Sequence, residues 1–175
     1  MVNSLLNINN HCYKYKEMKQ ICFNSNNLKN SSLSHDDEYF NIDNQLQYLL
    51  RYEKNELGDI SLNKTIKREI SKKMSSYKSQ DKKNGKYDDE QHISYQQLLN
   101  KLRSCEMKCY YCNSNLFLLY QKRGEPMQWS LERFDNNLGH YESNTCISCL
   151  KCNLQRRTSN HEYFKFSKNL SITKI

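Results

Sequence analysis

Hydrophobic residues recur at the spacing of α-helical turns in two stretches of the chain's first half. They are Leu46, Leu49 and Leu50 behind Asp43, and Ile66, Ile70 and Met74 further along. Because residues three or four apart share one face of a helix, each group predicts an amphipathic helix that packs against the rest of the protein.

A third helix is predicted by its first turn. Ser94 and Gln97 make a capping box, in which each side chain satisfies a backbone N–H at the helix start, and Ile93 and Leu98 hold the positions of a hydrophobic staple. An apolar stripe continues from Leu98, so we expect this helix to run to about Ser104.

The second half of the chain changes to the two-residue periodicity of strands. Residues 129–134 alternate well enough for one strand, residues 136–139 have turn chemistry, and residues 144–148 can return as a second strand. The composition of residues 150–157 favours a helix. The expected fold class is therefore α+β, with a hairpin followed directly by a helix.

Two stretches lack such patterns. Residues 1 to about 40 are rich in Asn, Ser and Lys with little periodic apolar surface, so we expect a loose or disordered arm. Residues 72–86 contain six lysines, interrupted by Asp81 and by Ser and Gly. This stretch indicates a solvated basic connector, with contact to phosphates as the alternative.

Four cysteines form two Cys-x-x-Cys pairs with 36 residues between them, and they are Cys109, Cys112, Cys149 and Cys152. A two-residue gap lets one turn aim two sulfurs at a single ion, and four thiolates close a tetrahedron around Zn²⁺ without an open position. We therefore expect a structural zinc site. Reduced, buried cysteines without a metal are the alternative.

Two further cysteines lie close to these pairs. Cys146 makes a second Cys-x-x-Cys with Cys149, and Cys105 lies four residues before Cys109. We expect the outer knuckle at Cys149 and Cys152 to hold the metal, and Cys146 to be a small buried apolar residue on the incoming strand. A redox role for Cys105 or Cys146 is the alternative.

These elements divide the chain into three segments. Residues 1–60 are expected to be a poorly ordered or helical N-terminal region, and residues 61–104 a helical extension. Residues 105–175 have the order knuckle, hairpin, knuckle, helix, which is typical of a small zinc-stapled treble-clef, or ββα-metal, domain.

The amino-acid composition limits the size of the core and the kinds of partner that the chain is expected to bind. Only 37% of the residues are apolar and 26% are charged, so the core is expected to be small and helped by the metal site. No apolar run approaches the length of a membrane span, and no secretory signal is evident at the N-terminus, so we expect a soluble, intracellular protein without a membrane partner. The net charge of +8 favours a polyanionic partner, above all nucleic acid.

At the hairpin the sequence resembles the HNH nucleases, particularly those with four zinc cysteines, such as the endonuclease VII type of junction resolvase. In that family an Asp-His pair ends the first strand, an asparagine precedes the second strand, and an Asn or His follows the last zinc cysteine. Glu132 and Arg133, Asn144, and Asn153 occupy those places. Because neighbours on a strand point to opposite faces, Glu132 and Arg133 are not expected to pair with each other.

Residues 128–136, 139–140 and 148–157 also look like HNH-type proteins of large DNA viruses, and the likeness extends from about residue 63 to about residue 166. The resemblance implies DNA as the nucleic-acid partner. It also implies a place in the cytoplasm or nucleus of a host cell, or in a virion. It leaves the oligomeric state open, a homodimer included.

The resemblance further implies hydrolysis of DNA phosphodiester bonds with one divalent ion, Mg²⁺ or Mn²⁺, held against the scissile phosphate. Glu132 and Asn153 would supply oxygen ligands to this ion, since a hard cation prefers carboxylate and amide oxygens. Asn144 would fix the loop between them. In the family, a histidine activates the attacking water.

Arg133 stands where that histidine should be. A guanidinium stays protonated and has no acceptor, so it cannot take a proton from water. Arg133 would instead grip the phosphate, and water activation would fall to His140, to Asp135 or to metal-bound water. The position of His140 in the turn after Gly139 nevertheless favours a solvent-exposed loop residue over this role. For Asp135 the alternative is an ordinary turn position.

The last predicted helix offers a binding surface. Asn153, Arg156 and Arg157 fall at i, i+3 and i+4, so they are expected to share one face toward phosphate, with Lys151 nearby. A merely solvated basic face is the alternative. The rival function keeps the zinc fold and the basic helix but no catalysis, which would make the chain a nucleic-acid-binding or complex-associated module.

Overall fold

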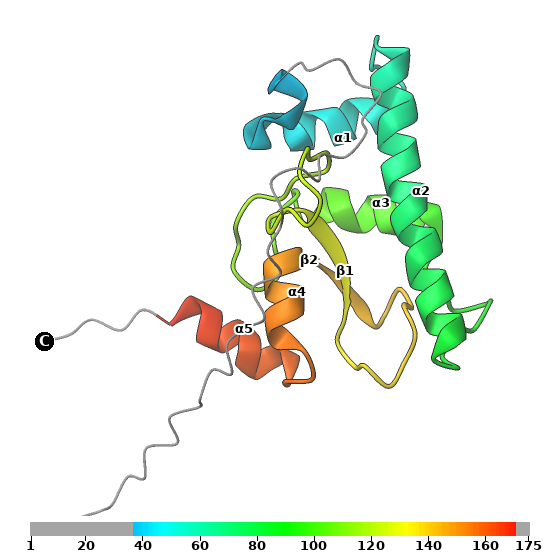
Figure 1. Ribbon diagram of the computed structural model, residues 1–175, viewed down its shortest axis with the longest axis vertical. Helices are drawn as coiled ribbons and strands as arrows, with labels where there is room; N and C mark the ends of the chain where they lie inside the picture. The colour runs from blue at the N-terminus through cyan, green and yellow to red at the C-terminus, as the bar shows by residue number, and fades with distance from the viewer. Residues whose placement is uncertain (1–36, 171–175) are drawn as a thin grey trace, which may run out of the picture.

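The computed structural model describes residues 37–170 of the chain (Figure 1). The expected N-terminal arm lies almost entirely outside the described residues. In chain order the elements are the 3₁₀ turns η1 (Asp37–Phe40) and η2 (Ile42–Asn44), the helices α1 (Gln45–Glu53), α2 (Ile60–Lys83) and α3 (Tyr95–Ser104), the strands β1 (Trp129–Arg133) and β2 (Thr145–Cys149), and the helices α4 (Leu150–Arg156) and α5 (His161–Asn169). The fold is α+β with one small antiparallel sheet.

The three N-terminal helices occur where the apolar spacing predicts them. The capping box of α3 is formed in full, because the Ser94 hydroxyl accepts from the Gln97 N–H and the Gln97 side chain accepts from the Ser94 N–H. The α2 helix begins behind Asp59, whose carboxylate accepts from two N–H groups of its first turn. The capping box therefore located the start of α3 correctly, whereas Asp59 was not singled out in the sequence as the start of α2.

The α2 helix is longer than expected. It continues to Lys83, so most of the lysine-rich stretch predicted as a solvated connector is helical. Lysine is a good helix former, and the apolar stripe of Ile66, Ile70 and Met74 continues into Tyr77, which gives the extra turns a buried side. The connector prediction was wrong for this reason.

The β1–β2 hairpin has the expected extent to within one residue at each strand end. Its register pairs Trp129 with Cys149 and Arg133 with Thr145, and α4 follows β2 without a linker. In Figure 1 the hairpin lies between α2 on one side and α4 on the other. This order matches the ββα arrangement predicted from the sequence.

The α2 helix covers the free edge of β1. The Tyr77 hydroxyl accepts a hydrogen bond from the Leu131 N–H at 2.9 Å, and the Lys73 ammonium donates to the Trp129 carbonyl. A two-stranded sheet leaves the outer backbone groups of each strand without partners, and buried groups of this kind are costly. The α2 side chains satisfy them, so the helical extension and the hairpin form one packed structure.

Within residues 37–170, one buried apolar cluster runs through these elements. Among its fully buried members are Leu49 of α1, Ile66 and Ile70 of α2, Leu102 of α3 and Trp129 of β1. None of the helices in the described part of the chain combines the length and apolarity that a membrane crossing requires.

The loop between β1 and β2 is docked against the end of α2 through Gly139. A Cβ atom at Gly139 would lie 2.4 Å from the Lys86 carbonyl oxygen and 2.7 Å from the Tyr141 ring. Only a residue without a side chain allows this approach. We predict that Gly139→Ala lowers the free energy of unfolding by about 1–3 kcal/mol, the usual cost of overpacking, in urea denaturation.

Gly58→Ala is the matched control, because a Cβ at Gly58 would meet nothing within 4 Å. Its free energy of unfolding should stay within about 0.5 kcal/mol of the wild type. Equal stability of the two variants would contradict the docking of the loop on α2.

Candidate functional site

The four cysteines predicted as metal ligands converge at one point. Their sulfur atoms all lie within 4.8 Å of one another, and the Cys112 and Cys149 sulfurs are 4.0 Å apart. A Zn²⁺ ion with Zn–S bonds of about 2.3 Å in a tetrahedron requires sulfurs about 3.8 Å apart. The cluster therefore has the size and composition of a site for a single zinc-like ion.

Local backbone geometry aims these sulfurs. Asn113 has a positive φ of 56° and donates its N–H to the Cys109 carbonyl, which closes the turn that carries the first pair. In the second pair, the Cys149 N–H points at the Cys109 sulfur and the Cys152 N–H at the Cys149 sulfur, each at 3.2 Å. Such N–H groups stabilise negatively charged sulfur.

Proton sharing among the sulfurs also indicates a cation site. Hydrogen bonds from Cys149 and Cys152 lower the pKa of Cys109 far below its usual range. The same contacts with Cys109 raise the pKa of Cys149 to about 12, and they raise the pKa of Cys152 as well. Three sulfurs this close cannot all ionise unless a cation compensates their charge, so metal binding would release protons.

The two remaining cysteines of this region lie outside the cluster. Cys146 is buried on β2 opposite Glu132, and burial raises the pKa of its thiol to about 12. Cys105 is half-buried and donates to the Leu102 carbonyl, and burial raises its thiol pKa too. Neither sulfur belongs to the group that converges, so the choice of the Cys149 and Cys152 knuckle agrees with the geometry.

A cavity of about 450 Å³ lies between α2, β1 and α4. It brings together five of the residues singled out in the sequence, which are Glu132, Arg133, His140, Asn153 and Arg157. The α2 helix adds a wall that the sequence did not predict, made of Lys73, Ser76, Tyr77 and Gln80.

Two asparagines that the resemblance singled out contact the hairpin in different ways. Asn153 lines the cavity and donates its amide N–H to the Ser130 hydroxyl at 2.9 Å. Among the described residues no hydrogen bond to its side-chain oxygen is formed. Asn144 is buried and clasps the loop, because its amide donates to the Asp135 and Gly139 carbonyls while its oxygen accepts from the Asp135 N–H. Asn144 therefore fixes the loop between the strands.

Glu132 is paired with Arg156 inside the protein. The Arg156 Nε lies 2.5 Å from Oε1 of Glu132, and the guanidinium also donates to the Arg133 and Ser159 carbonyls. Burial raises the pKa of Glu132, although Arg156 opposes the shift. Arg156 is only 2% exposed, so it does not share the solvent-facing side of α4 as the sequence predicted.

Arg133 points away from Glu132, as strand alternation requires. Its Nη1 donates to the Leu138 carbonyl at 3.0 Å and lies 3.8 Å from Oδ1 of Asp81. Lys151 is exposed on α4, and Arg157 is exposed just beyond the end of that helix. Asp135 accepts from the Asn137 N–H in the turn, which is the ordinary structural position for an aspartate there.

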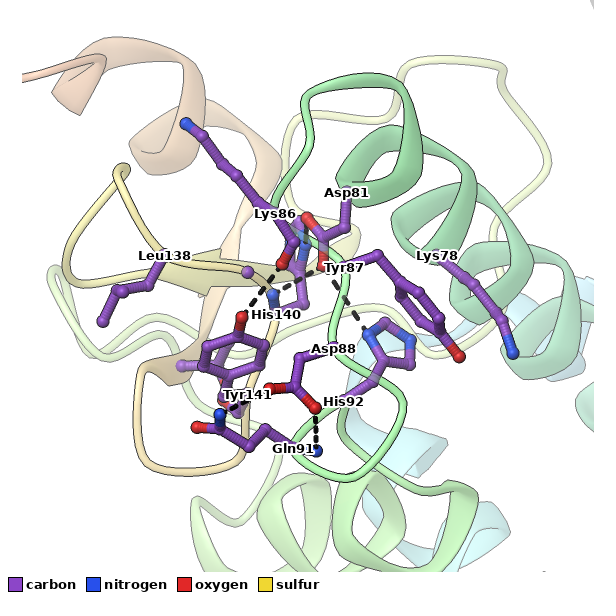
Figure 2. A network of polar contacts seen from close by, with 12 residues as sticks. Lys78, Asp81, Lys86, Tyr87, Asp88, Gln91, His92, Leu138, His140 and Tyr141 are labelled. Carbon is purple, nitrogen blue, oxygen red and sulfur yellow. Dashed lines mark hydrogen bonds and ion pairs between the residues drawn. The ribbon is translucent and has the colours of Figure 1, made fainter.

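His140 is not the solvent-exposed loop residue that the sequence favoured. It is 2% exposed, and its ring packs on Tyr77. Its Nδ1 lies 2.8 Å from Oδ1 of Asp81, and both residues are labelled in Figure 2. Burial lowers the pKa of His140 to about 4, with Arg133 and His92 acting in the same direction and Asp81 opposing them. The imidazole is therefore neutral at neutral pH and can accept a proton.

Asp81 was missed as a site residue. The sequence treated it as an interruption among lysines, yet it is completely buried near the end of α2. The signal was its helical register, because Asp81 lies four residues after Tyr77 on the stripe of Ile66, Ile70 and Met74. A lone carboxylate on the apolar side of a helix needs a buried partner.

No protein-family model, curated protein or solved structure shows significant similarity to the chain. The structure by itself establishes a small α+β fold with a four-cysteine cluster suited to a metal ion.

We predict that the purified wild-type protein contains one zinc per chain and that Cys112→Ser loses it, because three sulfurs no longer complete the tetrahedron. Elemental analysis by mass spectrometry measures the ratio. Cys146→Ala is the control and should keep its zinc, since Cys146 lies outside the cluster. A zinc-free wild type would refute the site.

The lowered pKa of His140 makes stability depend on pH. A histidine whose pKa is lower in the folded state than in the unfolded chain takes up its proton on unfolding. Its contribution is therefore complete above about pH 6.5 and is lost as pH falls toward 4. Asp81, Arg133, His92 and Tyr77 face the imidazole.

Between pH 7.5 and pH 5, wild type should lose about 2 kcal/mol more unfolding free energy than His140→Gln. Urea denaturation at the two pH values measures the difference. Both proteins carry the same four cysteines, so acid effects on that cluster cancel. Equal losses in the two proteins would contradict the buried, neutral state of His140.

Proposed function

We propose that the chain is a metal-dependent endonuclease of the HNH type that hydrolyses phosphodiester bonds in DNA. The observation that carries the proposal is the cavity between α2, β1 and α4. The end of β1 brings a carboxylate and an arginine to this cavity, and the loop after it brings a neutral imidazole. The α4 helix brings an amide group, and a second arginine follows that helix. This set matches the requirements of phosphoryl hydrolysis.

The four-cysteine cluster would hold Zn²⁺ as a structural ion. Four thiolates leave no coordination position for a substrate or a reactive water. The ion would instead fasten the turn of Cys109 and Cys112 to the end of β2 and the start of α4. It would thereby keep Asn153 beside Ser130 on β1.

The hydrolytic ion would be Mg²⁺ or Mn²⁺, held by oxygens of Asn153 and Glu132. The two contacts from Arg156 both fall on Oε1 of Glu132. Mg²⁺ keeps several waters and needs only one or two protein oxygens besides the substrate phosphate, so this sparse donor set suits it. Such an ion neutralises charge on the phosphate oxygens during hydrolysis.

The remaining residues bind and orient the substrate. Arg157 and Arg133 line the cavity and offer guanidinium donors to the phosphate. His140 accepts the proton of the attacking water. It thereby performs the water activation that the family assigns to a histidine at the position of Arg133. DNA as the polymer rests on the resemblance, and the charge of +8 supports any polyanion.

A non-catalytic nucleic-acid-binding module is the second candidate. The observation that favours it is the buried pair of Glu132 and Arg156, because a carboxylate already neutralised by a guanidinium is a weaker ligand for a cation. In this reading, the exposed Lys151 and Arg157 contact phosphates and the cavity performs no chemistry.

A cleavage assay separates the two candidates. We predict that wild-type protein nicks supercoiled or branched DNA with Mg²⁺ or Mn²⁺ but not with EDTA. Asn153→Ala should reduce the rate by about 100-fold or more, through loss of an oxygen that supports the developing charge. Gel electrophoresis measures the rate, and zinc content verifies that the variant keeps its fold.

Asn137→Ala is the matched control, because Asn137 is an exposed asparagine in the loop between β1 and β2 and does not line the cavity. It should cleave at the wild-type rate. If both the wild type and Asn153→Ala bind DNA but neither cuts it with Mg²⁺ or Mn²⁺, the endonuclease proposal is rejected and the binding module is supported.

A further inference from the structure

We infer that Asp81 holds His140 in the tautomer with its proton on Nδ1, so that Nε2 is the proton-accepting atom at the cavity. Asp81 is a positioning residue, because it acts through His140 and does not itself line the cavity. The tautomer follows from the contacts of the two residues alone. Its catalytic consequence rests on the proposed function.

Asp81 grips His140 at two atoms. Its Oδ2 accepts the backbone N–H of His140 at 2.7 Å, and its Oδ1 faces the ring Nδ1 at 2.8 Å. A carboxylate offers acceptors only, so the hydrogen of the second contact must reside on Nδ1. A neutral imidazole carries a single ring proton, and Nε2 is therefore left with its lone pair.

The surrounding backbone holds the ring in place. The His140 carbonyl accepts from the Ile93 N–H at 2.9 Å, and Gly139 lets the loop approach the end of α2 closely. Tyr77 packs on the imidazole with ring centroids 4.7 Å apart. In the described part of the chain no hydrogen bond involves Nε2, and His140 lines the cavity.

Two other groups approach the same carboxylate without competing for the ring. His92 Nδ1 lies 3.6 Å from Oδ2 (Figure 2). Arg133 Nη1 lies 3.8 Å from Oδ1. Both distances exceed that of a good hydrogen bond. Arg133 nevertheless compensates the buried charge of Asp81.

The consequence for hydrolysis is a complete proton path. As the water oxygen forms its bond to phosphorus, the water O–H bond breaks and its proton goes to Nε2. The bond from phosphorus to the leaving oxygen breaks with its electron pair, and that oxygen takes a proton from solvent. Asp81 stabilises the imidazolium that results, without taking the proton itself.

Nuclear magnetic resonance of the zinc-loaded protein with ¹⁵N-labelled histidine tests the tautomer at pH 7. The His140 signals are assigned by their loss in His140→Gln. We expect Nδ1 to carry the proton and Nε2 to have the shift of an unprotonated nitrogen. A proton on Nε2 instead would overturn the inference.

Cleavage kinetics test the consequence with Asp81→Asn. An asparagine amide can donate to Nδ1 and so move the ring proton to Nε2, where no proton can then be accepted. We expect the cleavage rate to fall about 100-fold with DNA affinity unchanged. The control is Asp89→Asn, the same change at an exposed aspartate nearby, which should leave rate and tautomer as in wild type.

Asp81→Glu keeps the carboxylate, and it should retain the Nδ1 proton and more activity than Asp81→Asn even if the latter folds poorly. If the wild type cleaves DNA and Asp81→Asn cleaves it at the same rate, the positioning role is wrong and the endonuclease proposal is kept. Inactive wild type with the expected tautomer rejects the endonuclease and supports the Asp81–His140 contact.

Discussion

The convergence of four sulfur atoms is the constraint on which the rest of the described structure depends. The Cys109–Cys112 turn and the Cys149–Cys152 knuckle are far apart in the chain, yet their sulfurs lie within 4.8 Å of one another. The contact sets where β2 ends and α4 begins. A chain that is only 37% apolar has a modest core, so a metal-binding cluster would add stability that burial supplies in larger domains.

A second set of contacts, separate from the cysteine cluster, joins α2 to the hairpin. Asp81, Tyr77 and Lys73 on successive turns of α2 bind the β1–β2 loop, the β1 backbone and the residues that precede β1. Each contact satisfies a buried polar group that a bare hairpin would leave without a partner. The cavity exists because α2 is held there, opposite α4 (Figure 1).

Charge is arranged in opposed pairs around that cavity. Glu132 and Arg156 form one pair on the α4 side of β1, while Arg133 and Asp81 lie near each other on the α2 side. Strand alternation places the neighbours Glu132 and Arg133 in different environments. Arg133 is thus accompanied by a buried histidine, His140, from the adjoining loop, and the proposed chemistry depends on both residues.

The sequence by itself determined the features that arise within a few residues. The capping box of Ser94 and Gln97, the two Cys-x-x-Cys spacings and the alternation of the strands each involve neighbours, so their patterns are legible in one dimension. Only the tertiary structure decided which polar groups meet. Asp81 and His140 are 59 residues apart and Glu132 and Arg156 are 24 apart. Arg156 is therefore buried against Glu132, and His140 against Asp81. A charged or polar side chain inside a protein is placed by the partner that the fold brings to it.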